Sequence, residues 1–245
     1  MMKIMENVYL VGSGQIGLSH PFDCHIYLVD GKDELALIDT GAGERVDKVL
    51  SNIEEDGFNP EKIGKIILTH HHADHSGGCK KIKDKTHCRI YIHEEGVKLV
   101  EQGDEEKMGL VVAKKSGLYS PNYTFQPFEV DVSIKDGDEV CVGKLKLKVF
   151  HTPGHSKDSV CFYIQDEGCK MLFSGDVVLF EGKIGLLNLS GSNLDDYRQS
   201  FDKVASLKID ALLPGHSLFT VKEGEQHVKK ASLALKKLSP PPNFI

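Results

Sequence analysis

The chain has 245 residues, 40% hydrophobic and 27% charged, which is ordinary for a globular protein and enough for one sizeable core. Its 36 acidic residues outnumber 30 lysines and arginines, giving a net charge of −6. Nucleic-acid and anionic-membrane surfaces need concentrated positive charge, so we expect neither partner. No apolar run approaches the roughly 20 residues that span a bilayer, and Glu6 and Asn7 interrupt the place of a signal peptide. We therefore expect one cytoplasmic domain over residues 1–245.

The first half of the chain alternates strand and helix patterns. Apolar residues recur on one face of Glu44–Glu55 at Val46, Val49, Leu50 and Ile53, which predicts a helix. Short β-branched runs predict strands before and after this helix, and a loop, Thr69–Gly78, separates the last two. The predicted strands are Val8–Val11, His25–Val29, Leu35–Ile38, Lys65–Leu68 and Arg89–Ile92.

The second half repeats this order of elements. A helix is predicted over Leu194–Leu207, capped by Asn193, and a final helix begins at a capping box of Thr220 and Glu223 and runs to about Leu238. The repeated order indicates two similar halves, packed as sheets with helices outside. The predicted strands are Glu129–Val132, Glu139–Val142, Leu145–Phe150, Val160–Ile164, Met171–Phe173 and Asp210–Leu213.

One segment is longer than an ordinary connection. Residues 94–126 mix helical patterns with Gly109 and Gly117, so they form either a lid or a plain pair of surface helices.

A histidine cluster after the strand Lys65–Leu68 concentrates the chemistry. His70, His72, Asp74 and His75 fit the spacing H-x-H-x-D-H and are followed by Gly77-Gly78. Imidazoles two positions apart in an extended segment point to the same side, so His70 and His72 can share one metal ion. A tight turn at Ala73 would let Asp74 and His75 face a second ion.

Further candidate ligands follow other predicted strands. His155, Asp176 and His216 each come shortly after a strand end, and each is directly preceded by a glycine that permits close backbone approach. Asp39, in another such loop, is expected to accept a hydrogen bond from a ligand imidazole instead of binding metal.

These motifs, in this order, resemble the metallo-β-lactamase superfamily, and the resemblance covers nearly the whole chain. It implies an α/β fold, a four-layer αβ/βα sandwich. It also implies that His70, His72 and His155 hold one metal, that Asp74, His75 and His216 hold the other, and that Asp176 bridges them. Members close to glyoxalase II and the lactonases keep both His75 and the bridging Asp, as here, whereas the best-known true β-lactamases replace one or the other.

We expect a dinuclear hydrolase acting on an ester, lactone or thioester of a small metabolite. Five imidazoles and two carboxylates suit zinc, the default, and equally iron or manganese. Two divalent ions would hold a hydroxide as the nucleophile, and Asp74 would be the catalytic residue that orients it and carries its proton. Phe180, which follows Asp176, is expected to wall an apolar substrate pocket.

Two other functions stay open. One is an iron-dependent oxygen or sulfur redox enzyme of the same fold, similar to the persulfide dioxygenases, which use a single iron. The other is a binding module that retains only the fold, and the complete set of seven ligands argues against it. The oligomeric state is also open, a homodimer included, and the Pro-rich end Pro240–Ile245 is a candidate contact.

Overall fold

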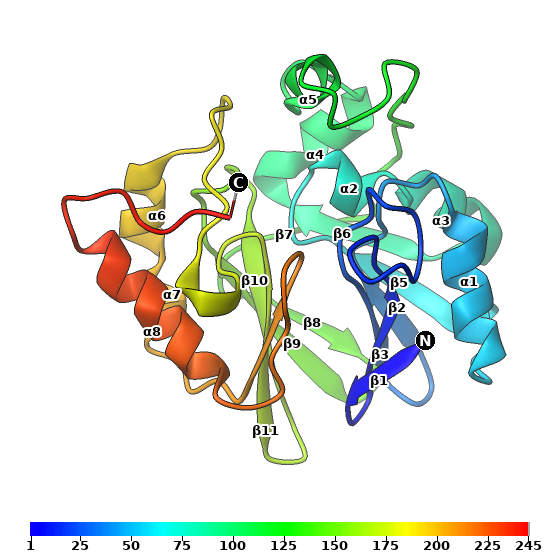
Figure 1. Cartoon of the computed structure of the whole chain (residues 1–245). Coiled ribbons are helices and arrows are strands. Elements are labelled where there is room, and N and C mark those ends of the chain that lie inside the picture. The colour runs from blue at the N-terminus through cyan, green and yellow to red at the C-terminus, as the bar shows by residue number, and fades with distance from the viewer. Residues whose placement is uncertain (245) are drawn as a thin grey trace.

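The computed structural model describes residues 1–244, and its N-terminal half forms a seven-stranded sheet. The strands lie in chain order (Figure 1). The first four are antiparallel neighbours, and β4 to β7 run parallel. These strands are β1 (Met2–Met5), β2 (Val8–Gly12), β3 (Ile26–Asp30), β4 (Leu35–Ile38), β5 (Ile63–Ile67), β6 (Arg89–His93) and β7 (Val132–Ile134).

A five-stranded sheet forms from the second half, in the order β12-β11-β10-β9-β8. Its neighbours are antiparallel except β11 and β12, which are parallel. The strands are β8 (Glu139–Val142), β9 (Leu145–His151), β10 (Val160–Asp166), β11 (Cys169–Gly175) and β12 (Ala211–Pro214).

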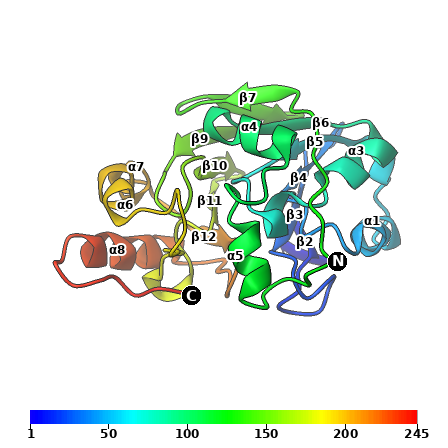
Figure 2. The ribbon, with the colours of Figure 1, turned by 90° about the horizontal axis from the view of Figure 1, so that it is seen from above.

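Helices cover the outer face of each sheet. Figure 1 shows α1 and α3 outside the first sheet and α6, α7 and α8 outside the second, and Figure 2 shows the same layers from above. The helices are α1 (Val46–Glu55), α2 (Ala73–Ser76), α3 (Cys79–Thr86), α4 (Glu94–Gln102), α5 (Leu110–Lys115), α6 (Leu194–Ser200), α7 (Asp202–Ala205) and α8 (Gly224–Leu235), with 3₁₀ turns at Pro60–Lys62 and Phe180–Gly182. The fold is the predicted four-layer sandwich. Within the described chain, no helix is long and apolar enough to cross a membrane.

Three apolar clusters lie between the layers of the fold. The central strands are buried on both faces, so each contributes side chains to two of these clusters. Tyr27 faces the other sheet, where its ring packs on Phe173 with centroids 5.4 Å apart. Its neighbour Leu28 faces α1 and packs in the cluster that contains Ile53. In the second sheet, Leu172 faces outward into the cluster formed with α6, α7 and α8. The period-two alternation of a strand thus places apolar side chains in two separate cores.

The predicted elements are found with three corrections. The helix predicted over Leu194–Leu207 is divided at Phe201 into α6 and α7, and the strand predicted over Glu129–Val132 lies later, at Val132–Ile134. Neither β1 nor α3 was predicted.

The third correction concerns the start of α8. The capping box of Thr220 and Glu223 does not form, because Glu223 adopts a left-handed conformation with φ 58° and its side chain makes no cap hydrogen bond. The backbone of Thr220 is engaged elsewhere, since it exchanges two hydrogen bonds with Leu212. The helix begins at Gly224 and ends at Leu235, short of the predicted Leu238.

The two sheets approach each other closely where two hairpin turns meet. Gly143, between β8 and β9, has φ +55°, and a Cβ there would overlap the carbonyl oxygen of Gly31 between β3 and β4. We expect Gly143→Ala to lower the free energy of unfolding by more than ~2 kcal/mol, since a left-handed alanine alone costs about 1–2 kcal/mol. Chemical denaturation measures the loss.

Gly137→Ala is the matched control, because Gly137 also has a positive φ of +86° but its Cβ would meet nothing within 4 Å. It should lower the free energy of unfolding only by the cost of a left-handed alanine, about 1–2 kcal/mol. Equal losses in the two variants would contradict close approach of the turns as the reason for Gly143.

Candidate metal centre

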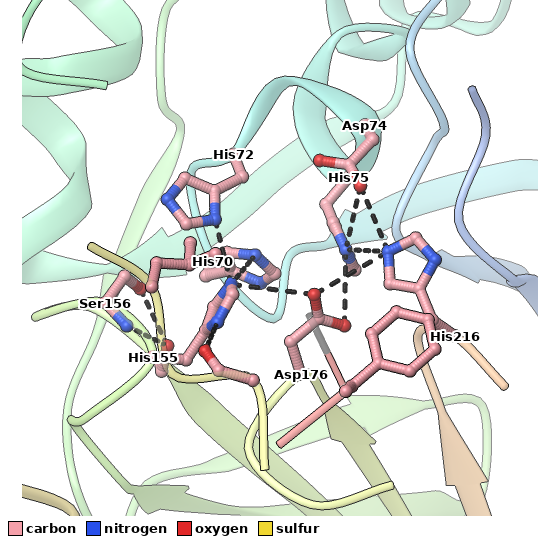
Figure 3. Close-up of polar contacts among 12 residues, drawn as sticks. His70, His72, Asp74, His75, His155, Ser156, Asp176 and His216 are labelled. Carbon is pink, nitrogen blue, oxygen red and sulfur yellow. Dashed lines mark hydrogen bonds and ion pairs between the residues drawn. The ribbon is translucent and has the colours of Figure 1, made fainter. Parts of the chain in front are cut away.

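The seven predicted ligands come together at one edge of the two sheets (Figure 3). His70, His72, Asp74 and His75 follow β5 and extend into the short helix α2. The other three follow strands of the second sheet: His155 after β9, Asp176 in the loop after β11, and His216 after β12. The packing of the sheets therefore brings together residues that are far apart in sequence.

Three imidazoles form one group. The Nε2 atom of His155 lies 3.1 Å from Nε2 of His70 and 2.9 Å from Nδ1 of His72. All three ring nitrogens fall within 4.8 Å of one another, close enough to be ligands of one metal ion.

A second group consists of Asp74, His75 and His216. The Nε2 atom of His216 lies 3.0 Å from Oδ2 of Asp74 and 3.3 Å from Nε2 of His75. These ligand atoms also fall within 4.8 Å of one another.

Asp176 lies between the two groups. Its Oδ2 is 3.5 Å from Nε2 of His155 and 3.6 Å from Nε2 of His216, while Oδ1 is 3.5 Å from Nε2 of His75. The Oδ1 atom is buried and has no hydrogen-bond partner. A buried carboxylate oxygen without a donor is costly, and a cation between the groups would satisfy it.

Hydrogen bonds to the outer nitrogens of the His70 and His155 rings leave the inner nitrogens with lone pairs that point into the centre of the site. Nδ1 of His155 contacts the carbonyl oxygen of Gly185, so this nitrogen carries the hydrogen. The hydroxyl of Thr69 donates to Asp39 and therefore accepts from Nδ1 of His70, 3.0 Å away. In the neutral tautomers, Nε2 of both rings is left as a lone pair facing the other ligands, and this arrangement fits a metal ion.

Asp39 lies where the sequence analysis placed it, beneath a candidate ligand. Its Oδ2 is 2.8 Å from Nδ1 of His75 and also accepts from the Thr69 hydroxyl, while Oδ1 accepts from the Thr69 backbone N–H. The residue has φ 62°, a left-handed conformation that Asp tolerates better than most side chains. One buried carboxylate thus orients His75 and, through Thr69, His70.

The electrostatics differ between the two groups. Burial, reinforced by the neighbouring imidazoles of His75 and His155, holds the pKa of His70 well below its ordinary value, so the ring stays neutral. Burial also lowers the pKa of His75, but nearby acidic groups, Asp176 and Asp74 among them, outweigh it and raise that pKa well above the ordinary value. The part of the site around His75 therefore favours positive charge.

The backbone fits closely around these side chains. A Cβ on Gly215 would collide with Oδ1 of Asp176 and with the ring of His75. Only glycine permits the His216 loop to pass this close to the other ligands, which is the reason expected for a glycine before a ligand.

Two supporting residues were not identified from the sequence. The hydroxyl of Tyr197 donates to the Asp176 carbonyl and accepts from the Gly185 backbone N–H, both at 3.2 Å, although the sequence analysis gave it no part in the site. Asp158 lies 2.7 Å from Nδ1 of His71 and holds this ring away from the ligands. The burial that makes the Tyr197 hydroxyl need a hydrogen-bond partner is known only from the structure. The His71–Asp158 pair is separated by 87 positions and has no sequence signal either.

A cavity of about 540 Å³ opens above the ligands, with His72, Asp74, His155, Asp176 and His216 in its lining. The segment 94–126, predicted to be an insertion, contains α4 and α5, and some of its residues between Met108 and Tyr119 line the cavity. The motion of this segment as a lid stays a prediction. Phe180 does not line this cavity, contrary to expectation. Its ring packs against His227, with centroids 4.7 Å apart, because the 3₁₀ turn Phe180–Gly182 lies against α8.

Comparisons with known proteins agree with the fold and the motifs. The family model described as "Metallo-beta-lactamase superfamily" matches residues 20–216. The probable metallo-hydrolase YqgX of Bacillus subtilis (strain 168) is 32% identical over 201 residues, covering 80% of this chain and 86% of that protein. The acyl-coenzyme A thioesterase MBLAC2 of Homo sapiens is 29% identical over 210 residues, covering 78% of this chain and 72% of that protein.

A solved structure gives the same picture of the fold. The metallo-beta-lactamase GOB-18 from Elizabethkingia meningoseptica superposes with a TM-score of 0.74 at 24% identity, covering 96% of this chain and 88% of that one. Because the family model matches residues 20–216, a range that contains all seven candidate ligands, the chain belongs to the metallo-beta-lactamase superfamily.

Proposed function

We propose that this chain is a dinuclear metal-dependent hydrolase that cleaves an ester, thioester or lactone of a small molecule. The observation that carries the proposal is the arrangement of the ligands: two groups of three side chains, with Asp176 within 3.6 Å of nitrogen atoms in both. His70, His72 and His155 would hold one ion, and Asp74, His75 and His216 the other. Zinc is the first choice, with iron and manganese as alternatives for the same donor set.

The chemistry of the bound ions suits hydrolysis. Two divalent ions would bring the pKa of a water molecule close to neutrality and polarise the substrate carbonyl. Among the chain's own residues, Asp74 has a side chain that is 25% exposed and lines the cavity, so it can reach both water and substrate. We assign to Asp74 the orientation of the attacking water and the transfer of its proton to the leaving group.

The relatives favour the thioester as the bond cleaved. MBLAC2 is named an acyl-coenzyme A thioesterase, and YqgX a probable metallo-hydrolase. The iron-dependent redox alternative uses one ion, and here the second group of ligands is complete, which supports hydrolysis instead.

The first test is metal stoichiometry. We expect two ions per chain, because seven candidate ligands exceed the four that one tetrahedral site uses. Elemental analysis of protein loaded with zinc and freed of excess metal measures this, and His216→Ala should lower the content toward one. A wild-type content that stays at one ion under saturating metal would refute the dinuclear site and favour the redox alternative.

The second test addresses Asp74. Asp74→Asn should lower kcat for a thioester by about 10²–10⁴-fold, the usual contribution of a positioned acid or base, because the amide cannot accept the proton. Asp23→Asn is the control, since Asp23 lines the same cavity but its carboxylate accepts from the backbone N–H groups of Ala42 and His20. Equal rates for Asp74→Asn and wild type, at full metal content, would remove Asp74 from the mechanism.

The third test addresses Asp39. Asp39→Asn keeps the left-handed backbone but removes the charge that orients His75, so metal should bind about 10–100-fold more weakly. Competition with a chromophoric chelator measures the affinity. Asp158→Asn removes a similar carboxylate from His71, which is outside the ligand groups, and should lower stability more than metal affinity. Unchanged affinity in Asp39→Asn would show that Asp39 has no role in holding the ligand.

A further inference from the structure

The walls of the cavity above the metal ligands are mostly apolar. Phe22, Met108, Leu110, Leu118, Leu187 and Phe244 contribute to them. No lysine or arginine lines the cavity in the part of the chain that the structure describes. A phosphate or carboxylate bound between these walls would have no cationic side chain to pair with, so the walls suit an uncharged, apolar group.

One of these walls comes from the C-terminal end of the chain. The sequence analysis offered Pro240–Ile245 as a contact for a second subunit, and Ile245 lies outside the described residues. The preceding residues instead pair with their own chain, where Ile184 donates to the Pro242 carbonyl at 3.0 Å and accepts from the Phe244 N–H at 2.9 Å. The Asn243 side chain adds hydrogen bonds to both the N–H and the carbonyl of Leu186. We call residues 242–244 the C-terminal strap.

The strap rests on the loop that supports the candidate metal ligands. Residues 184–186 include Gly185, whose carbonyl contacts Nδ1 of His155. The strap places the ring of Phe244 against His216, with centroids 5.8 Å apart and the ring planes 18° from parallel. In Figure 1 the red segment that follows α8 runs back toward the middle of the molecule, between its two halves.

Large apolar side chains are left exposed in the cavity lining. Phe244 is 38% exposed and Leu118, after α5, is 59% exposed, and both line the cavity. Covering exposed apolar surface around a cavity with an apolar ligand is favourable and stabilises the complex. These two residues belong to opposite halves of the fold, so a group bound between them would contact both.

We propose that the cavity binds the apolar acyl group of the substrate and that Phe244 on the C-terminal strap determines which acyl groups are accepted. This assignment rests on the proposed hydrolase function and adds the substrate class to it. The acyl carbonyl lies over the metal ligands, the acyl chain extends between Leu118 and Phe244, and the leaving group points out of the cavity. Phe244 is a specificity-determining residue, because its ring contacts the acyl chain of the substrate and not the reacting atoms.

The test uses thioesters that share one uncharged thiol and differ only in the acyl group: acetyl, butyryl, hexanoyl and octanoyl. With the wild-type holoenzyme, kcat/KM should rise about three- to fourfold for each methylene that enters the cavity. Phe244→Ala should lower kcat/KM for the octanoyl substrate by about tenfold and leave the acetyl substrate within about twofold. Phe244→Leu, which keeps an apolar wall, should restore the preference for long chains.

A matched control and a second measurement keep the test decisive. Leu238→Ala alters a fully exposed apolar residue near the same terminus, outside the cavity lining, and should change no substrate. Calorimetry measures the binding of n-octanol to the metal-free protein. We expect this binding to weaken in Phe244→Ala and not in Leu238→Ala. This binding does not depend on catalysis.

The outcomes separate the two proposals. If wild type hydrolyses none of the esters, thioesters or lactones tried, the proposed function fails, and octanol binding still reports on the cavity. If wild type hydrolyses thioesters with the same chain-length profile as Phe244→Ala, the acyl-site assignment is overturned while the hydrolase stands. A loss that is equal for every acyl group and accompanied by loss of metal would also overturn it, because Phe244 would then act only as a support for His216.

Discussion

The carboxylate of Asp39 is the contact on which the geometry of the candidate metal centre depends. It accepts three hydrogen bonds, two from Thr69 and one from His75, and so joins the end of β4 to the loop that follows β5. Because Thr69 in turn accepts from His70, one buried acid fixes the tautomer of a ring in each ligand group. Charge-assisted hydrogen bonds of this kind are short and directional, so a small change at Asp39 would propagate to both groups.

The rest of the ligand set depends on how the two sheets pack. His155, Asp176 and His216 are carried by loops of the second sheet, and their distances from the first-sheet ligands are set by the core between the sheets. That core is closely packed, with Tyr27 against Phe173 and the Tyr27 hydroxyl donating to the carbonyl of Pro214, two residues before His216. Packed cores resist small displacements, so a core of this kind holds candidate ligands from the two sheets at fixed distances from one another.

The sequence was sufficient for the elements that have a strong local signal and for the clustering of the candidate ligands. The H-x-H-x-D-H spacing and the glycines before His155, Asp176 and His216 identified residues that the structure brings together.

The sequence was insufficient where tertiary contacts decide: Glu223 starts α8 from a left-handed conformation because Thr220 is already paired with Leu212. Phe180 was expected near the substrate because it follows Asp176, but the intervening turn directs its ring toward His227 on α8. The strap has no sequence signal, since its pairing with residues 184–186 joins segments more than fifty positions apart.

The charge of the site bears on what the cavity can accept. The ligand set contains two carboxylates, Asp74 and Asp176, so two divalent ions would leave the floor of the cavity with excess positive charge. A free carboxylate or phosphate on the substrate would be drawn to that floor, where it would compete with the reacting carbonyl for the same ions. In the proposed function, an apolar group between Leu118 and Phe244 would not compete in this way, because only the walls would stabilise it and the carbonyl would be the one polar group directed at the ions. Under the proposed function, the contrast between polar floor and apolar walls would orient the substrate, and Phe244 on the strap supplies part of the apolar wall.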